Sequence, residues 1–174
     1  PDFTNPNKAC VNTCVTFTNL STPAYNENCV ESTLYEWDFG DGSGIYSITS
    51  SGKPNPPCHV YTLPGVYTIT LTTYGYCGVF TKQGTICIEP QLSPQFTLNT
   101  IQGCSPLAVT STNTTNLTNI CPGNPTYQWN VNYVAGYCGS GTPTWSFTNG
   151  TSATSANPSF NFVTPGTYNV SVTM

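Results

Sequence analysis

Charged side chains are scarce in this 174-residue sequence, which has 7 Asp and Glu, 3 Lys (Lys8, Lys53 and Lys82) and no Arg. They make up 6% of the chain, against about a quarter in typical globular proteins. Without arginine there is no bidentate fork for phosphate, and so few cations exclude a nucleic-acid partner. Aromatic residues reach 13%, whereas disordered chains combine few aromatics with high net charge. The chain is therefore expected to fold.

Groups for acid–base chemistry are also missing. Residues 90–174 contain no Asp, Glu, Lys, Arg or His, and His59 is the only histidine of the chain. No serine lies in a nucleophile-elbow pattern that would complete a triad with it. Glu27, Glu31 and Glu36 form a carboxylate cluster, but carboxylates on a short strand and loop are more often a solvated face. We predict no enzyme activity, no catalytic residue and no cofactor.

Long apolar runs are absent too, so the sequence predicts no membrane span in this segment and no leader at its start. Nine cysteines are present, without the close C-x-x-C pairs that hold zinc. Such a count in a short chain is typical of disulfides formed in an oxidising compartment. We expect a secreted, extracellular or cell-surface protein, with one sulfur left over from the odd count.

What is abundant is short alternating segments rich in Thr, Val, Tyr and Ile, separated by 15 Gly and 15 Pro. This period of two predicts half-buried antiparallel strands, and no segment favours a helix. The segments occur twice: Pro1-Asp-Phe-Thr corresponds to Pro94-Gln-Phe-Thr, Trp37 to Trp129, and Pro64-Gly65 to Pro165-Gly166. We predict two domains, 1–92 and 93–174. The last strand of the first, Val79–Ile88, has no counterpart before residue 174, so the second domain is expected to lack its last strand.

One motif makes a family resemblance specific. The turn Trp37-Asp38-Phe39-Gly40-Asp41-Gly42 is followed by Pro57-Cys-His-Val-Tyr61 and by Pro64-Gly-Val-Tyr-Thr68. In this order the three segments resemble the polycystic kidney disease (PKD) domain family. The resemblance implies an all-β fold of two tandem immunoglobulin-like sandwiches without catalytic function. The second domain resembles a diverged copy, with Asn130-Val-Asn132 in place of the acidic turn and Phe160 in place of the histidine. Its opening, Cys104-Ser-Pro-Leu-Ala-Val109, is similar to modules of bacterial surface adhesins.

The acidic turn has two interpretations. Asp38 and Asp41 flank glycines, and aspartates that accept backbone N–H bonds stabilise such turns. The rival is a calcium site, which needs about six to eight oxygen ligands and therefore more acidic residues than this loop offers. We favour the structural interpretation and predict no metal site. For His59 we expect packing and hydrogen bonding within the sandwich edge.

Given the sandwich that the resemblance implies, cysteine pairs can be assigned by the end of the sandwich at which they lie. We expect Cys29–Cys77 at one end, and Cys10–Cys87 with Cys14–Cys58 at the other. Cys104, Cys121 and Cys138 are the candidates for an unpaired or inter-chain cysteine.

Two kinds of surface site remain open. Sugar rings stack on exposed aromatics, for which Trp145 is our candidate, although most such rings in sandwiches are core residues. Asn-x-Ser/Thr sequons occur at Asn19, Asn113, Asn116, Asn149 and Asn169, and a secreted glycoprotein would use some of them.

Together these patterns favour an extracellular structural or adhesive module, a segment or subunit of a surface protein or filament. Its partners would be other copies of itself or neighbouring domains, with glycans as further candidates. Its open edge would be completed either by a strand donated from another chain or by further sequence of the same, longer chain. The alternative is a carbohydrate-binding accessory module of a secreted hydrolase.

Overall fold

The computed structural model describes residues 1–22, 25–26, 29–30, 32–76, 78–136 and 142–174, all of them in strands, turns and loops. Within these ranges no helix is long and apolar enough to cross a membrane. The chain divides into two compact units. Unit 1 is Pro1–Gln91 together with Asn119–Pro122, and unit 2 is Leu92–Thr118 together with Gly123–Met174. A short segment from the second half of the sequence, Asn119–Pro122, thus belongs to unit 1.

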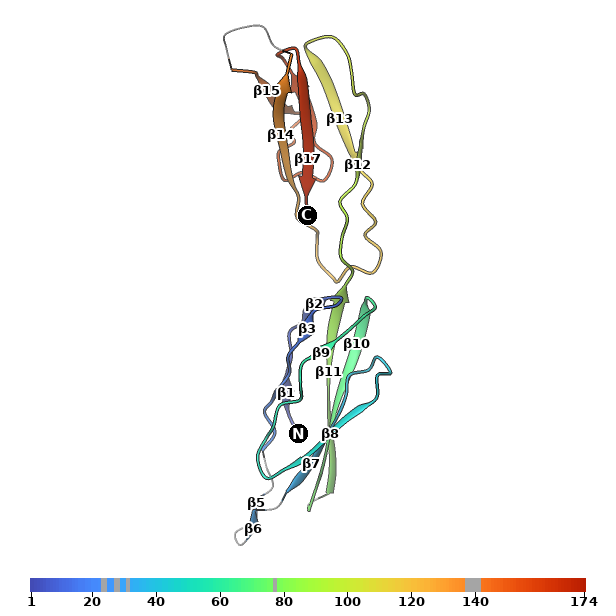
Figure 1. Ribbon diagram of the computed structural model, residues 1–174, viewed down its shortest axis with the longest axis vertical. Coiled ribbons are helices and arrows are strands. Elements are labelled where there is room, and N and C mark those ends of the chain that lie inside the picture. The colour runs from blue at the N-terminus through green and yellow to red at the C-terminus, as the bar shows by residue number, and fades with distance from the viewer. Residues whose placement is uncertain (23–24, 27–28, 31, 77, 137–141) are drawn as a thin grey trace. The chain divides into compact units, whose positions relative to one another are not determined.

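Unit 1 is built from short strands and one long hairpin (Figure 1). Its strands are β1 (Phe3–Thr4), β2 (Lys8–Cys10), β3 (Cys14–Val15), β4 (Thr18–Asn19), β5 (Tyr25–Asn26), β6 (Cys29–Val30), β7 (Thr33–Asp38), β8 (Ile45–Ser50), β9 (His59–Val60), β10 (Gly65–Gly75) and β11 (Gly78–Glu89).

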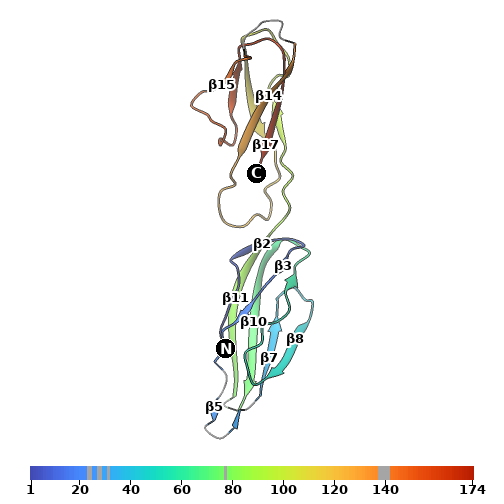
Figure 2. The same cartoon turned by 60° about the vertical axis from the view of Figure 1, so that its left-hand side comes forward.

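The main sheet of unit 1 has the strand order β2-β11-β10-β7-β8. Strands β10 and β11 form an antiparallel hairpin that stays in register from Gly65 opposite Ile88 to Gly75 opposite Gly78. At the far edge of β11, β2 adds a parallel pair in which Glu89 lies opposite Cys10. Figure 2 shows the five strands of this sheet side by side. The separate pairs β1–β4 and β3–β9 contribute Phe3 and Val15 to the core that packs against the sheet. Strand β11 is thus an inner strand, with neighbours on both sides.

The core of unit 1 follows from the period-two pattern. Tyr35 and Trp37 on β7, and Ile69 and Leu71 on β10, are 0% exposed, while the residues between them reach the surface. Phe3 packs edge-on against Trp37 with ring centroids 5.2 Å apart. The buried cluster contains Phe3, Val15, Phe17, Tyr35, Trp37, Phe39, Tyr61, Ile69, Leu71, Ile86 and Ile88.

Unit 2 repeats part of this plan with six strands over its described residues. They are β12 (Phe96–Leu98), β13 (Leu107–Asn113), β14 (Gln128–Ala135), β15 (Trp145–Thr148), β16 (Ser159–Phe162) and β17 (Thr167–Thr173). One sheet has the order β12-β13-β16-β15, and the other consists of β14 and β17. Leu71 faces Trp37 in unit 1 and Val172 faces Trp129 in unit 2, so β17 corresponds to β10. The buried cluster between the sheets is Val109, Trp129, Phe160 and Phe162.

Candidate functional site

The acidic turn of unit 1 follows β7 directly. Asp38 Oδ1 accepts a hydrogen bond from the Gly40 N–H at 2.8 Å, and Asp41 Oδ1 accepts from the N–H of Ser43 at 3.1 Å. Gly40 has φ +79°, and a Cβ at this position would collide with the carbonyl oxygen of Thr68. Only glycine fits such a backbone without strain. Both carboxylates are therefore used to close the turn.

The same turn binds the histidine segment. Asp41 Oδ2 lies 2.7 Å from His59 Nε2, and each side chain is only 15% exposed. The imidazole stacks on Phe39 with ring centroids 4.1 Å apart and meets Tyr61 edge-on at 4.8 Å. Tyr61 donates its hydroxyl to the carbonyl oxygen of Phe39 at 3.1 Å. The three motif segments thus meet in one cluster, and it is His59 that joins the turn to β9.

This environment shifts two pKa values. Burial alone would raise the pKa of Asp41, but hydrogen bonds from Ser43 and His59 outweigh it and leave the pKa below its ordinary value. Burial, followed by the charges of Asp41 and Asp38, raises the pKa of Tyr61 well above the ordinary range. Asp41 is accordingly ionised and Tyr61 protonated at neutral pH.

The cluster offers little chemistry. In a catalytic triad the histidine stands between the acid and the serine. Here Asp41 occupies the centre, because Ser43 Oγ donates to Asp41 Oδ1 at 2.6 Å while His59 binds Oδ2. Ser43 is thus not activated by a base. Among the residues that the structure describes, no three His, Cys, Asp or Glu side chains gather in a way that could hold a metal ion.

Unit 2 has neither the ionisable groups of this cluster nor its turn, because β14 continues past Trp129 to Ala135. Phe160 stands where unit 1 has His59, and Asn130 stands where unit 1 has Asp38. Asn130 and Asn132 both lie within β14, opposite Ser171 and Asn169 of β17. Trp129 Nε1 donates to the carbonyl oxygen of Ser155 at 2.9 Å. The indole N–H of Trp37 has no such acceptor among the described residues of unit 1. In unit 2 the tryptophan is therefore fixed by a hydrogen bond from its indole N–H to an uncharged backbone carbonyl in a loop.

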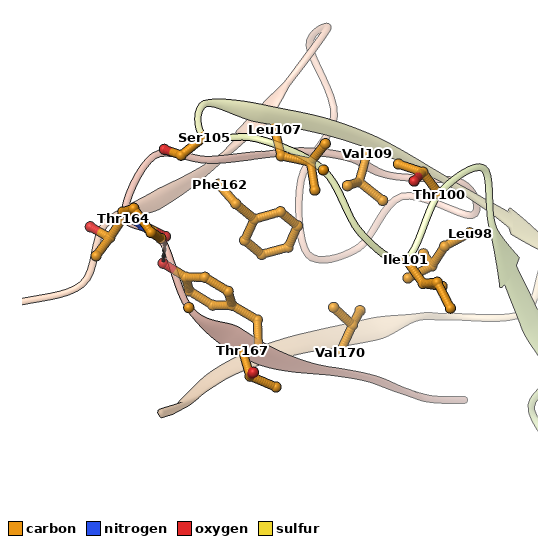
Figure 3. Close-up of a pocket in the computed structure, with 14 residues that line it drawn as sticks. Leu98, Thr100, Ile101, Ser105, Leu107, Val109, Phe162, Thr164, Thr167 and Val170 are labelled. Atoms are coloured by element: carbon orange, nitrogen blue, oxygen red, sulfur yellow. Dashed lines mark hydrogen bonds between the residues drawn. The ribbon is translucent and has the colours of Figure 1, made fainter. Parts of the chain in front are cut away.

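The second site is a groove between the two sheets of unit 2. Its volume is about 240 Å³, which exceeds the roughly 150 Å³ of an apolar cavity that binds benzene. Leu107 and Val109 from β13 and Phe162 from β16 point into it from one side, and Val170 from β17 points into it from the other (Figure 3). Leu98 and Ile101 border one end, and Ile101 is 88% exposed. The groove is therefore an open slot with apolar side chains on its strands and the hydroxyl residues Thr100, Ser105 and Thr164 on its loops.

The two units differ in what covers this slot. In unit 1, β10 pairs with β7 on one side and with β11 on the other. In unit 2, β17 pairs with β14, and no other described strand lies beside it. Ile69 and Leu71 are 0% exposed, whereas Val170 and Val172 at the corresponding positions are only half-buried. The free edge of β17 thus coincides with an uncovered part of the core.

The cysteines follow the expected pattern in part. Cys14 is bonded to Cys58, as expected, but Cys87 is bonded to Cys121. The expected Cys10–Cys87 pair is therefore wrong, and so is Cys121 as an unpaired candidate. The physical reason is that Cys10 lies opposite Glu89, while the segment 119–122 belongs to unit 1 and brings Cys121 to a Cα distance of 5.7 Å from Cys87.

Of the remaining cysteines, some have a free thiol and the others lie outside the residues that the structure describes. Cys10 and Cys104 are free and exposed. Cys77, Cys138 and the side chain of Cys29 lie outside the described residues, so the Cys29–Cys77 pair stays a prediction.

The sequons differ in access. Asn19 is 2% exposed, and its Nδ2 donates to the Pro54 carbonyl while its Oδ1 accepts from the Ser21 N–H. The folded chain cannot accept a glycan there, so this candidate is wrong. Asn113 is half-buried, and its Nδ2 donates to the hydroxyl of Tyr127. The exposed candidates are Asn116, Asn149 and Asn169.

The sugar-stacking candidate is not a free ring. Trp145 on β15 is half-buried and packs edge-on against Phe147 with centroids 5.1 Å apart. It also lies beside Phe160 of the core. Its position favours a packing role, as is common for aromatics in sandwiches.

Two layers of strands around a tryptophan core, with the acidic turn and the histidine joined, define an immunoglobulin-like β-sandwich module. The profile of the PKD domain family matches residues 1–89 of the 174. The chain belongs to this family, as its motifs predicted. No curated protein matches the chain. A solved structure described as "Structural basis for the promiscuous specificity of the carbohydrate-binding modules from the beta-sandwich super family" is similar over 98% of this chain and 93% of its own, at 18% identity and a TM-score of 0.43.

Proposed function

We propose that this chain is a non-catalytic structural module of an extracellular surface protein or filament. We propose further that it joins its neighbour by accepting a strand along β17. The observation that carries the proposal is the difference between Val170, only half-buried at an open groove, and Ile69, fully buried on β10 beside β11. A sandwich edge with free N–H and C=O groups is a template for another strand.

The remaining features support a mechanical role. In unit 1 the side chains of Asp38 and Asp41 form hydrogen bonds that close the turn and bind His59 of β9. Two disulfides span 44 and 34 residues of sequence, and such bonds typically stabilise small secreted domains by about 2 to 4 kcal/mol each. A module of this kind bears load through its strands and does no chemistry.

The strand is supplied by a second polypeptide in this proposal. Residues 90–174 carry no charged side chain, so little electrostatic repulsion keeps neighbouring molecules away from unit 2. An added strand would form backbone hydrogen bonds with β17 and place alternate side chains in the groove, as in other cases of β-strand addition.

Hydrogen exchange tests this proposal. A synthetic peptide with the sequence of β11, in which Cys87 is replaced by serine, is added to the chain 1–174. The expected result is slower exchange of the β17 amides, with no change on β10, whose edge is already filled. Equal exchange on β17 with and without the peptide would contradict the proposal.

A further inference from the structure

The groove of unit 2 has a template within the same chain. Because β17 corresponds to β10, the strand that fills the groove corresponds to β11. In the β10–β11 pairing, Ile86 lies opposite Tyr67, Gly84 lies opposite Ile69, and Lys82 lies opposite Leu71. The corresponding residues of β17 are Tyr168, Val170 and Val172. The contacts of β11 therefore indicate which side chains an added strand must carry.

The first requirement is a small residue opposite Val170. Gly84 occupies this place in unit 1, and a Cβ there would lie 3.0 Å from Phe3 Cζ, closer than carbon atoms normally approach. In unit 2 Phe96 takes the place of Phe3 and packs edge-on against Trp129 at 4.8 Å, as Phe3 does against Trp37 at 5.2 Å. A larger side chain on the added strand would have to displace Phe96 from the core.

The second requirement is aliphatic side chains two and four residues later. Ile86 and Ile88 of β11 are both 0% exposed. The place they would take in unit 2 is the groove lined by Leu107, Val109 and Phe162 (Figure 3). No charged side chain lines this groove, so a charged residue on the inward face would lie there without a partner, at high cost.

The third requirement concerns direction. Strand β11 runs antiparallel to β10 and parallel to β2, with Glu89 opposite Cys10. The counterpart of β2 in unit 2 is the segment 102–104, which is exposed and forms no strand. An added strand would run parallel to this segment and antiparallel to β17. The residue that follows its second aliphatic side chain would lie beside the free thiol of Cys104.

We infer that the groove accepts a strand with the pattern small-x-aliphatic-x-aliphatic, antiparallel to β17. The small residue lies opposite Val170, the inward face is uncharged from that residue onward, and the strand ends beside Cys104. This inference rests on the proposed function and names the partner of the same site. It specifies one register, because a shift of a single residue would turn every aliphatic side chain out of the groove.

Disulfide capture tests the register. The probe is a peptide with the sequence of residues 79–89 carrying Cys87→Ser and Glu89→Cys, its thiol held as a mixed disulfide with thionitrobenzoate. A thiolate of the chain attacks the peptide sulfur and releases thionitrobenzoate, which is coloured, and peptide mapping identifies the cysteine that reacted. Cys10 is the internal control, since it is equally free and exposed but lies beside a filled groove.

The expected result is capture at Cys104 at least tenfold faster than at Cys10. A second peptide that also carries Gly84→Val is expected to lose this advantage, and so is one with the sequence reversed. If the probe slows β17 exchange but all three peptides react alike at Cys104, the register is wrong while the proposed function stands. If no peptide slows β17 exchange or favours Cys104, the proposed function fails and the inference fails with it.

Discussion

Paired substitutions at Ile69 and Val170 measure how much of each core is covered. Ile69 is 0% exposed between β7 and β11. Ile69→Ala removes three buried carbons, about 2.4 kcal/mol at roughly 0.8 kcal/mol each. A cavity contribution raises the expected loss of unfolding free energy to about 3 to 4 kcal/mol. Val170 is half-buried at the groove. Val170→Ala removes two carbons that are only partly buried, so we expect a loss of about 1 kcal/mol, less than the roughly 1.6 kcal/mol of full burial.

The assay is denaturant unfolding of the chain 1–174, with hydrogen exchange of β10 and β17 to assign each loss to its unit. Thr68→Ala and Asn169→Ala serve as matched controls, because both side chains are exposed on the outer faces of the same strands. Each is expected to change the unfolding free energy by no more than about 0.5 kcal/mol. Equal losses for Ile69→Ala and Val170→Ala would refute the reasoning, since Val170 would then be covered without any added strand.

Three further predictions concern charge, disulfides and the half-buried tryptophan. Because the pKa of Asp41 is lowered in the folded state, its contribution to stability is present above its ordinary pKa and is lost as the pH falls through the folded value. The melting temperature of unit 1 should therefore fall in acid, and it should fall less in the variant Asp41→Asn. Unit 2 has no Asp, Glu or His, so its melting temperature should stay constant from about pH 4 to 8. An equal fall with and without the substitution would show that Asp41 is not responsible. Cys121→Ser opens a loop of 34 residues and should cost about 3 to 4 kcal/mol in chemical unfolding, whereas an unchanged midpoint would contradict a stabilising bond. Trp145→Ala should lower the unfolding free energy by about 2 kcal/mol, because the ring is half-buried against Phe147. Unchanged stability together with loss of binding on a glycan array would favour the carbohydrate-binding alternative.

The sequence predicted the sandwich architecture because its determinants are local. The alternation of β7 and β10, and the turn after Trp37, specify which side chains face inward without reference to distant residues. The correspondence of Pro64-Gly65 with Pro165-Gly166 likewise identified β10 and β17 as equivalent strands. The open edge of β17 was expected on the same ground.

Contacts between distant segments could not be predicted in this way. The Asp41–His59 pair joins residues 18 apart, and its formation depends on where β9 lies beside the turn. The Cys87–Cys121 bond was missed because residues 119–122 leave the sequence order of the repeats and join unit 1. The burial of Asn19 depends on the carbonyl oxygen of Pro54, which approaches only in the folded chain.

An image of the native assembly, at a resolution that separates strands, tests the central claim most directly. The account predicts an extended segment of a second polypeptide along β17, antiparallel to it, with aliphatic side chains between Val109 and Val170 and its end beside Cys104. A bare β17 edge with an empty groove would contradict strand addition. A strand continuous with Met174 of the same molecule would contradict the second polypeptide as its source.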